Sequence, residues 1–125
     1  MSTQIEILIK FKNILVLFID ELIEQFPYDS DLILCRIYIK DQIPIENIMK
    51  LFIQHFYPQK KLIEEKNQTF FLEGTQSFFD HLKLKTNVFK KIWLSDTLDD
   101  EDRVVIWEWI NSLLTLVDKY NKAFN

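Results

Sequence analysis

Glycine and cysteine are almost absent from this chain, and each shortage removes a class of chemistry. A single glycine among 125 residues does not suit the glycine-rich loops that hold nucleotide phosphates or form oxyanion holes. A single cysteine, Cys35, excludes an intrachain disulfide, a thioredoxin-type motif and a paired-cysteine zinc site. Cys35 also lies in an apolar stretch, where a buried and unreactive thiol is expected. We therefore expect no enzyme and no cofactor.

The sequence also lacks a recognisable set of metal ligands. His55 and His81 are its two histidines, and neither belongs to an HExxH pattern. The acidic run at residues 99–102 lacks the alternating ligands and central glycine of an EF-hand loop. Because this run precedes a long apolar pattern, its negative charge suits the free amides at the start of a helix. We therefore expect helix capping there, and no metal site.

Neither an excess of positive charge nor a long apolar run is present. The net charge of -4 argues against a general nucleic-acid binder, which usually carries a basic excess. The longest apolar run, at residues 14–19, is far shorter than the ~20 residues of a membrane-spanning helix. The first residues do not show the pattern of a signal peptide. These features predict a cytoplasmic protein without a membrane partner.

What the sequence does contain is helical periodicity, which predicts one all-α domain over residues 1–125. We expect a single compact bundle of five to seven helices, in which long N-terminal and C-terminal helices supply most of the core. Residues 32–39 could instead form a buried strand, because they are rich in β-branched side chains. Gly74 is expected to end a helix in the left-handed conformation. The expected helices are 3–26, 29–40, 44–56, 59–67, 75–84, 87–95 and 99–124, with one further short helical segment at 70–73.

The last of these helices is too apolar for an ordinary surface helix. Its apolar arc spans roughly 200°, whereas about 100° is enough to cover one core. Either the short central helices cover both flanks, or one flank contacts another protein chain. The residues that would form such an interface are Val105, Trp107, Trp109, Leu114 and Leu116.

Four lysines follow one another without an acidic residue between them. Lys83, Lys85, Lys90 and Lys91 occur together with Phe89 and Trp93 and could contact phosphates or an acidic partner. The other interpretation, which we favour, is a solvated surface opposite a packed apolar face.

Two long stretches of the chain resemble small uncharacterised proteins encoded by giant nucleocytoplasmic DNA viruses. They are FIDELIEQFPYDSDLILCRIYIKDQIPIENIM and FFDHLKLKTNVFKKIWLSDTLDDEDRVVIWEWINSLLTLVDKY. This resemblance supplies no catalytic or binding residue. It implies a setting in the cytoplasm or viral factory of an infected cell, or in the virion.

The sequence therefore predicts a non-catalytic helical protein of a large DNA virus that acts by interaction or as a scaffold. Its expected partner is another protein chain, either a second copy or a different protein. The alternatives are a nucleic-acid-associated accessory factor that uses the four lysines, and a structural component of the virion.

Overall fold

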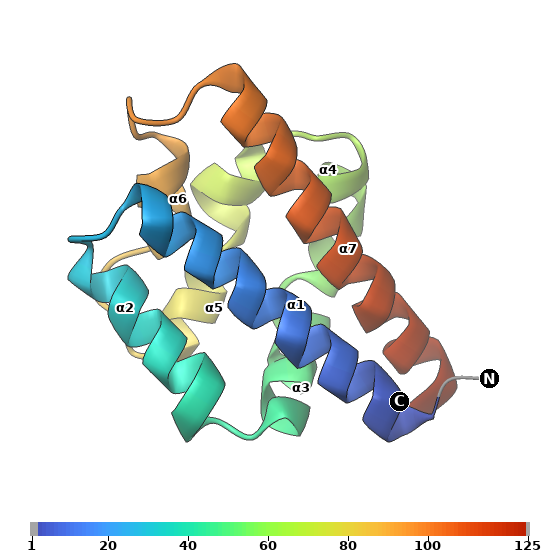
Figure 1. The fold of residues 1–125 in the computed structure, drawn as a ribbon. Helices are drawn as coiled ribbons and strands as arrows, with labels where there is room; N and C mark the ends of the chain where they lie inside the picture. Colours follow the sequence, from blue (N-terminus) through green and yellow to red (C-terminus); the bar gives the residue numbers. More distant parts are fainter. Residues whose placement is uncertain (1–2, 125) are drawn as a thin grey trace.

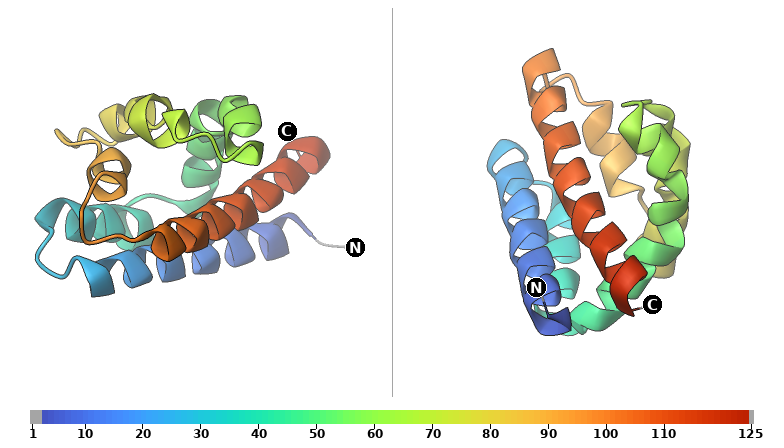
Figure 2. Two further views of the ribbon diagram at one scale, coloured as in Figure 1. Left: turned by 90° about the horizontal axis from the view of Figure 1, so that it is seen from above. Right: turned by 90° about the vertical axis from the view of Figure 1, so that its right-hand side faces the viewer.

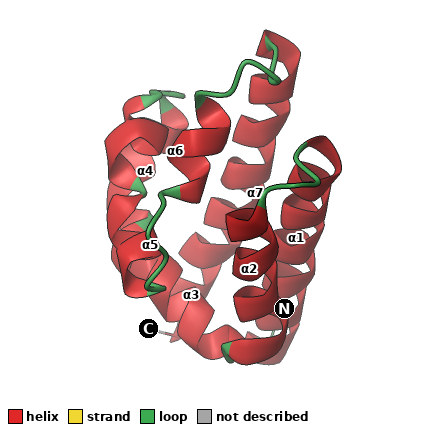
Figure 3. Cartoon of the chain, turned by 90° about the vertical axis from the view of Figure 1, so that its left-hand side faces the viewer, coloured by secondary structure: helices red, strands yellow, loops and turns green. Residues whose placement is uncertain are grey.

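The computed structural model describes residues 3–124, and all regular elements within that range are helical (Figure 3). The α-helices are α1 (Gln4–Gln25), α2 (Ser30–Ile37), α3 (Ile45–His55), α4 (Lys60–Glu64), α5 (Gln76–His81), α6 (Val88–Trp93) and α7 (Asp100–Phe124). Shorter helical turns are η1 (Tyr38–Gln42), η2 (Tyr57–Gln59) and η3 (Phe70–Gly74). The predicted all-α fold class and the two long terminal helices are therefore confirmed. Residues 32–39 are helical, which excludes the strand.

Polar side chains fix where the helices begin. The Thr3 hydroxyl accepts a hydrogen bond from the Glu6 amide at 3.1 Å, and a carboxylate oxygen of Asp29 accepts one from the Leu32 amide at 3.0 Å. Asp99 and Asp102 cap α7 reciprocally, because each carboxylate accepts a hydrogen bond from the other residue's amide, at 2.8 and 3.1 Å. Such caps satisfy amides that a first helical turn leaves unpaired. The acidic run thus stabilises the start of α7, as predicted.

The two terminal helices lie side by side and antiparallel, and they form the most extensive contact between elements (Figure 1). The Gln4 side-chain amide donates a hydrogen bond to the Tyr120 hydroxyl at 2.9 Å, which joins the beginning of α1 to the end of α7. Helix α2 packs along α1, and α3 to α6 cover the inner side of this layer (Figure 2).

Aromatic side chains fill the space between the long and short helices. The Phe71 ring stacks on Trp93 with centroids 4.2 Å apart, and its edge meets Trp107 at 4.7 Å. Edge-to-face and offset contacts of this kind add to the free energy gained by burying the rings. The buried rings of this cluster belong to Phe11, Phe18, Phe52, Phe56, Phe70, Phe71, Phe78, Phe79, Phe89, Trp93 and Trp107.

Two details differ from the sequence-based expectations. Gly74 does not have a positive φ, so its predicted left-handed conformation is wrong. It instead allows a close approach, because a Cβ at this position would lie 3.1 Å from the Gln59 side-chain oxygen. The expected helix over 59–67 is also shorter, since α4 ends at Glu64 and Lys66 adopts a φ of 51°.

Candidate binding groove

The five residues of α7 that were predicted to form an interface differ in their exposure to solvent. Trp107, Leu114 and Leu116 are buried, with exposed fractions of 5 to 7%. The prediction that these three contact another chain is therefore wrong, because the short helices and α1 cover them. Val105 is 44% exposed and Trp109 is partly buried, so these two remain at the surface.

Trp109 lies at the boundary between α7 and α1. Its indole stacks on Phe18 at a centroid distance of 5.8 Å, and its Nε1 donates a hydrogen bond to the Glu21 carboxylate at 3.0 Å. The open side of the ring borders a shallow cavity of about 310 Å³, which Glu108 also lines. Trp109 thus packs mainly within its own chain and leaves a small acidic recess beside it.

The four lysines lie on the surface but do not form one free basic patch. Lys90 and Lys91 belong to α6, whereas Lys83 and Lys85 lie in the preceding connection. The Lys91 ammonium is 2.8 Å from an Asp29 oxygen and 3.3 Å from an Asp31 oxygen. Burial lowers the pKa of Lys91, but these two carboxylates outweigh that effect and raise it. Lys91 therefore joins α6 to the start of α2.

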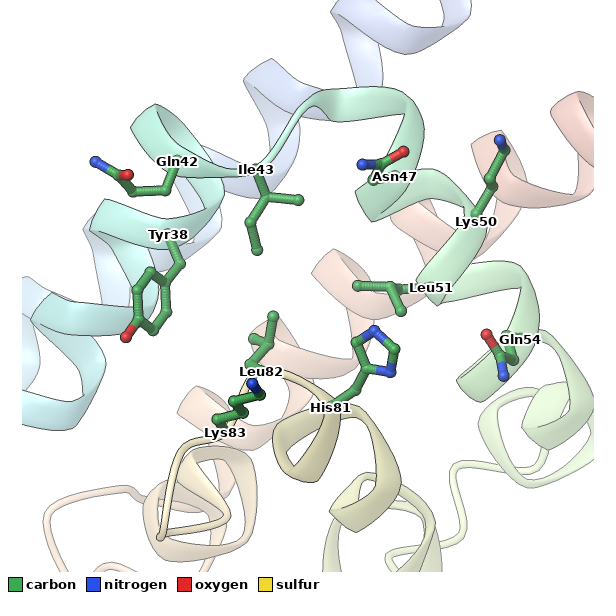
Figure 4. Close-up of a pocket in the computed structure, with 10 residues that line it drawn as sticks. All are labelled: Tyr38, Gln42, Ile43, Asn47, Lys50, Leu51, Gln54, His81, Leu82 and Lys83. Atoms are coloured by element: carbon green, nitrogen blue, oxygen red, sulfur yellow. The ribbon is translucent and has the colours of Figure 1, made fainter.

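A groove of about 630 Å³ lies between η1, α3 and the end of α5 (Figure 4). Three apolar side chains, Ile43, Leu51 and Leu82, point into its centre. The groove is open to solvent and has enough volume to take several side chains of a ligand. Its ten lining residues are Tyr38, Gln42, Ile43, Asn47, Lys50, Leu51, Gln54, His81, Leu82 and Lys83.

Local backbone features hold the groove open. Ile43 has an extended conformation at the end of η1, and Pro44 caps α3, so the chain turns sharply between the two walls. On the opposite side, Lys83 follows α5 with a φ of 61°. The Lys83 amide bonds to the Asp80 carbonyl at 3.0 Å and the Leu84 amide bonds to the Phe79 carbonyl at 3.1 Å. This is a Schellman motif with lysine in the position that glycine usually occupies.

The groove carries positive charge although the chain as a whole is acidic. Lys50 and Lys83 stand at its rim, His81 lies between them, and its lining includes no carboxylate. The lining also includes no serine, threonine or cysteine that could act as a nucleophile. Cys35 lies elsewhere in the core, where burial raises the pKa of its thiol to about 12. The groove therefore suits binding of an apolar, negatively charged group.

His81 pairs with the second histidine just behind the groove wall. The two imidazole centroids are 5.8 Å apart, and His55 Nδ1 lies 2.9 Å from the Ser77 hydroxyl. Burial, and then the proximity of His81, lowers the pKa of His55. Within residues 3–124, no group of three or more His, Cys, Asp or Glu side chains is placed to hold a metal ion.

No pattern in the sequence indicated this groove, although two of its residues, His81 and Lys83, were candidates for other sites. The lining residues come from positions 38 to 83 and share no motif. The nearest local signal was Pro44, which marks a turn but not a cavity.

Within the described range, no helix combines the length and apolar character needed to cross a membrane. Comparisons with known proteins gave no match to a family model, to a curated protein or to a solved structure.

Proposed function

We propose that this protein is a non-catalytic helical binding protein, and that the groove between η1, α3 and α5 takes a segment of another protein chain. The observation that carries this proposal is the combination of an apolar centre with a lysine-bearing rim and no carboxylate. The apolar side chains of a binding pocket provide surface for burial, and the polar groups placed around them set its selectivity.

The shape of the groove favours a peptide segment over a compact metabolite. The groove is open to solvent instead of enclosing its ligand, and its volume has room for several side chains. The amide side chains of Gln42, Asn47 and Gln54 line the groove and could form hydrogen bonds with a peptide backbone. The expected segment carries apolar anchors beside Asp or Glu residues, which would face Lys50 and Lys83.

The structure gives less support to the nucleic-acid alternative. Lys91 is held by two aspartates, and Lys83 faces a groove instead of continuing the surface of α6. An interaction or scaffold role in a large DNA virus, in the cytoplasm, viral factory or virion, remains part of our proposal.

A bulky substitution in the groove tests the proposed function. Asn47 is exposed on α3, so Asn47→Trp should fill the groove while the core remains intact. The matched control is Asn13→Trp, which places the same side chain on an exposed position of α1. We compare the proteins that bind to each variant by quantitative crosslinking and affinity purification. We expect some proteins to bind to Asn13→Trp and no longer to Asn47→Trp. Direct titration with each such protein should then show at least a tenfold weaker affinity for Asn47→Trp. Identical sets of bound proteins for both variants would contradict the proposal.

A further inference from the structure

We propose that the groove binds the corner between α6 and α7 of a second copy of this chain, so that molecules associate head to tail. This inference rests on the proposed function of the groove and names its occupant. The corner, called the acidic corner below, comprises Leu94, Asp96, Asp100, Glu101 and Val104.

The acidic corner exposes apolar side chains that its own chain does not cover. Leu94 is 58% exposed at the end of α6, and Val104 is 49% exposed on the first turns of α7. A single exposed apolar residue needs no explanation, but one on each of the two helices that this corner joins offers anchors for an apolar groove. The groove has space for such anchors between Ile43, Leu51 and Leu82.

The charges of the two surfaces are complementary. Asp96, Asp100 and Glu101 are exposed, and none of them forms an ion pair within residues 3–124. The rim lysines, Lys50 and Lys83, likewise form no ion pair within the described range. Opposite charges on facing surfaces accelerate encounter and select the orientation of docking.

The acidic corner is also fixed in shape before it binds. The Arg103 guanidinium donates hydrogen bonds to the carbonyls of Trp93 at 2.9 Å, Ser95 at 3.2 Å and Leu98 at 3.0 Å. Asp99 and Asp102 meanwhile hold the first turn of α7 by their reciprocal caps. A ligand that is already ordered loses less conformational entropy on binding, which strengthens a small contact.

The positions of the two surfaces require a second molecule. The α6–α7 connection lies at the top of Figure 1, whereas α3 and the end of α2 lie near the bottom, so the acidic corner cannot reach the groove of its own chain. Two different surfaces then meet in each contact, which is a heterologous arrangement. Such contacts form a ring if the rotation closes and an open filament if it does not.

Sedimentation of the unmodified protein gives the first test. A contact between one corner and one groove is small, so we expect weak association that appears between about 10 µM and about 1 mM protein. Because charge contributes, association should decrease when salt is raised from about 0.05 M to about 0.5 M. A protein that stays monomeric at about 1 mM in low salt would overturn the inference.

Charge reversal on each surface gives a sharper test. Lys50→Glu/Lys83→Glu should abolish association, and Asp96→Lys/Glu101→Lys should do the same. An equimolar mixture of these two variants should associate again, because every groove then meets a corner of opposite charge. The matched control, Lys61→Glu/Lys90→Glu, changes the charge equally at exposed positions outside the groove and should associate like the unmodified protein. Failure of the mixture to associate, with both variants folded by circular dichroism, would overturn the inference.

Nuclear magnetic resonance of the unmodified protein avoids any question of variant folding. Concentration-dependent shifts should be confined to amides of the groove and of the acidic corner. Shifts at other surfaces would overturn the inference. The proposed function would stand if Asn47→Trp still lost a different protein partner, so the two failures can be told apart.

Discussion

At the scale of single residues, the two tryptophans of α7 have different environments although they are two positions apart. Trp107 is enclosed by Phe70, Phe71 and Trp93, and only 5% of its surface is exposed. Trp109 rests on one ring, that of Phe18, and borders an open cavity. The free energy of unfolding should therefore depend much more on Trp107.

We expect Trp107→Ala to lower the free energy of unfolding by about 3–5 kcal/mol, because it leaves a large void among aromatic rings. Trp109→Ala should cost less than about 2 kcal/mol, because part of the ring already faces solvent. Urea denaturation monitored by far-UV circular dichroism measures both values. Equal losses for the two variants would contradict this assignment.

His55 gives the protein a dependence on pH that can be assigned to one side chain. Its pKa lies below the ordinary value of 6.5, because burial and then His81 disfavour its charged form. The His55 imidazole therefore takes up a proton more readily in the unfolded chain than in the folded protein. The free energy of unfolding should have its full value above pH 6.5. It should decrease as the pH falls from 6.5 toward the pKa of His55 in the folded protein.

The variant His55→Asn should weaken this dependence, since an amide can replace Nδ1 beside Ser77 without titrating. The measurement is the urea midpoint between pH 7.5 and pH 5, a window above the ordinary pKa of the carboxylates. His81→Asn serves as a companion, because it removes the neighbouring imidazole but keeps His55. An unchanged slope in His55→Asn would refute the assignment.

At the scale of elements, two helices are followed by a lysine in a conformation that favours glycine. Lys66 and Lys83 have φ values of 51° and 61°, whereas Gly74 does not have a positive φ. After α4, the Lys66 amide bonds to the Ile63 carbonyl at 3.1 Å and the Asn67 amide to the Leu62 carbonyl at 2.9 Å. Both helix ends are thus Schellman motifs that carry a strained residue.

Replacing Lys66 by glycine should relieve this strain. The left-handed conformation costs a non-glycine residue roughly 1–2 kcal/mol, and glycine would avoid this cost. Part of the resulting gain in stability is lost, because glycine has more conformational freedom in the unfolded chain. We expect Lys66→Gly to stabilise the protein by about 0.5–1 kcal/mol in urea denaturation. Lys85→Gly is the control, because Lys85 does not have a positive φ and should gain nothing. A destabilised Lys66→Gly would show that its side chain matters more than its backbone.

These helix ends also show what the sequence could predict. Periodicity and caps located α1, α3 and α7 to within a residue or two at each end, because Thr3, Pro27, Pro44 and Asp99 act locally. The left-handed residues could not be found in this way, because lysine has no preference for that conformation. Hydrogen bonds from neighbouring turns impose it.

At the scale of the whole molecule, the groove was unpredictable for a related reason. Tyr38, Leu51 and Leu82 come from separate parts of the chain, and only the packing of η1, α3 and α5 around the aromatic cluster brings them together. The sequence did predict that α7 is too apolar for one face. The sequence could not show whether the flanks of α7 are covered by α1 and the short helices or by another chain. The fold decides this, because it buries Trp107, Leu114 and Leu116.

The packing of α1 against α7 has a consequence for synthesis on the ribosome. The 74 residues between Gln25 and Asp100 must be translated after α1 is made and before its main partner begins to appear. At typical elongation rates this takes on the order of 10 s. During that interval the apolar face of α1 is covered at most by α2 to α6, and the nascent chain is exposed to chaperones and to aggregation. Slower elongation within this segment should therefore reduce the yield of folded protein without any change in its sequence.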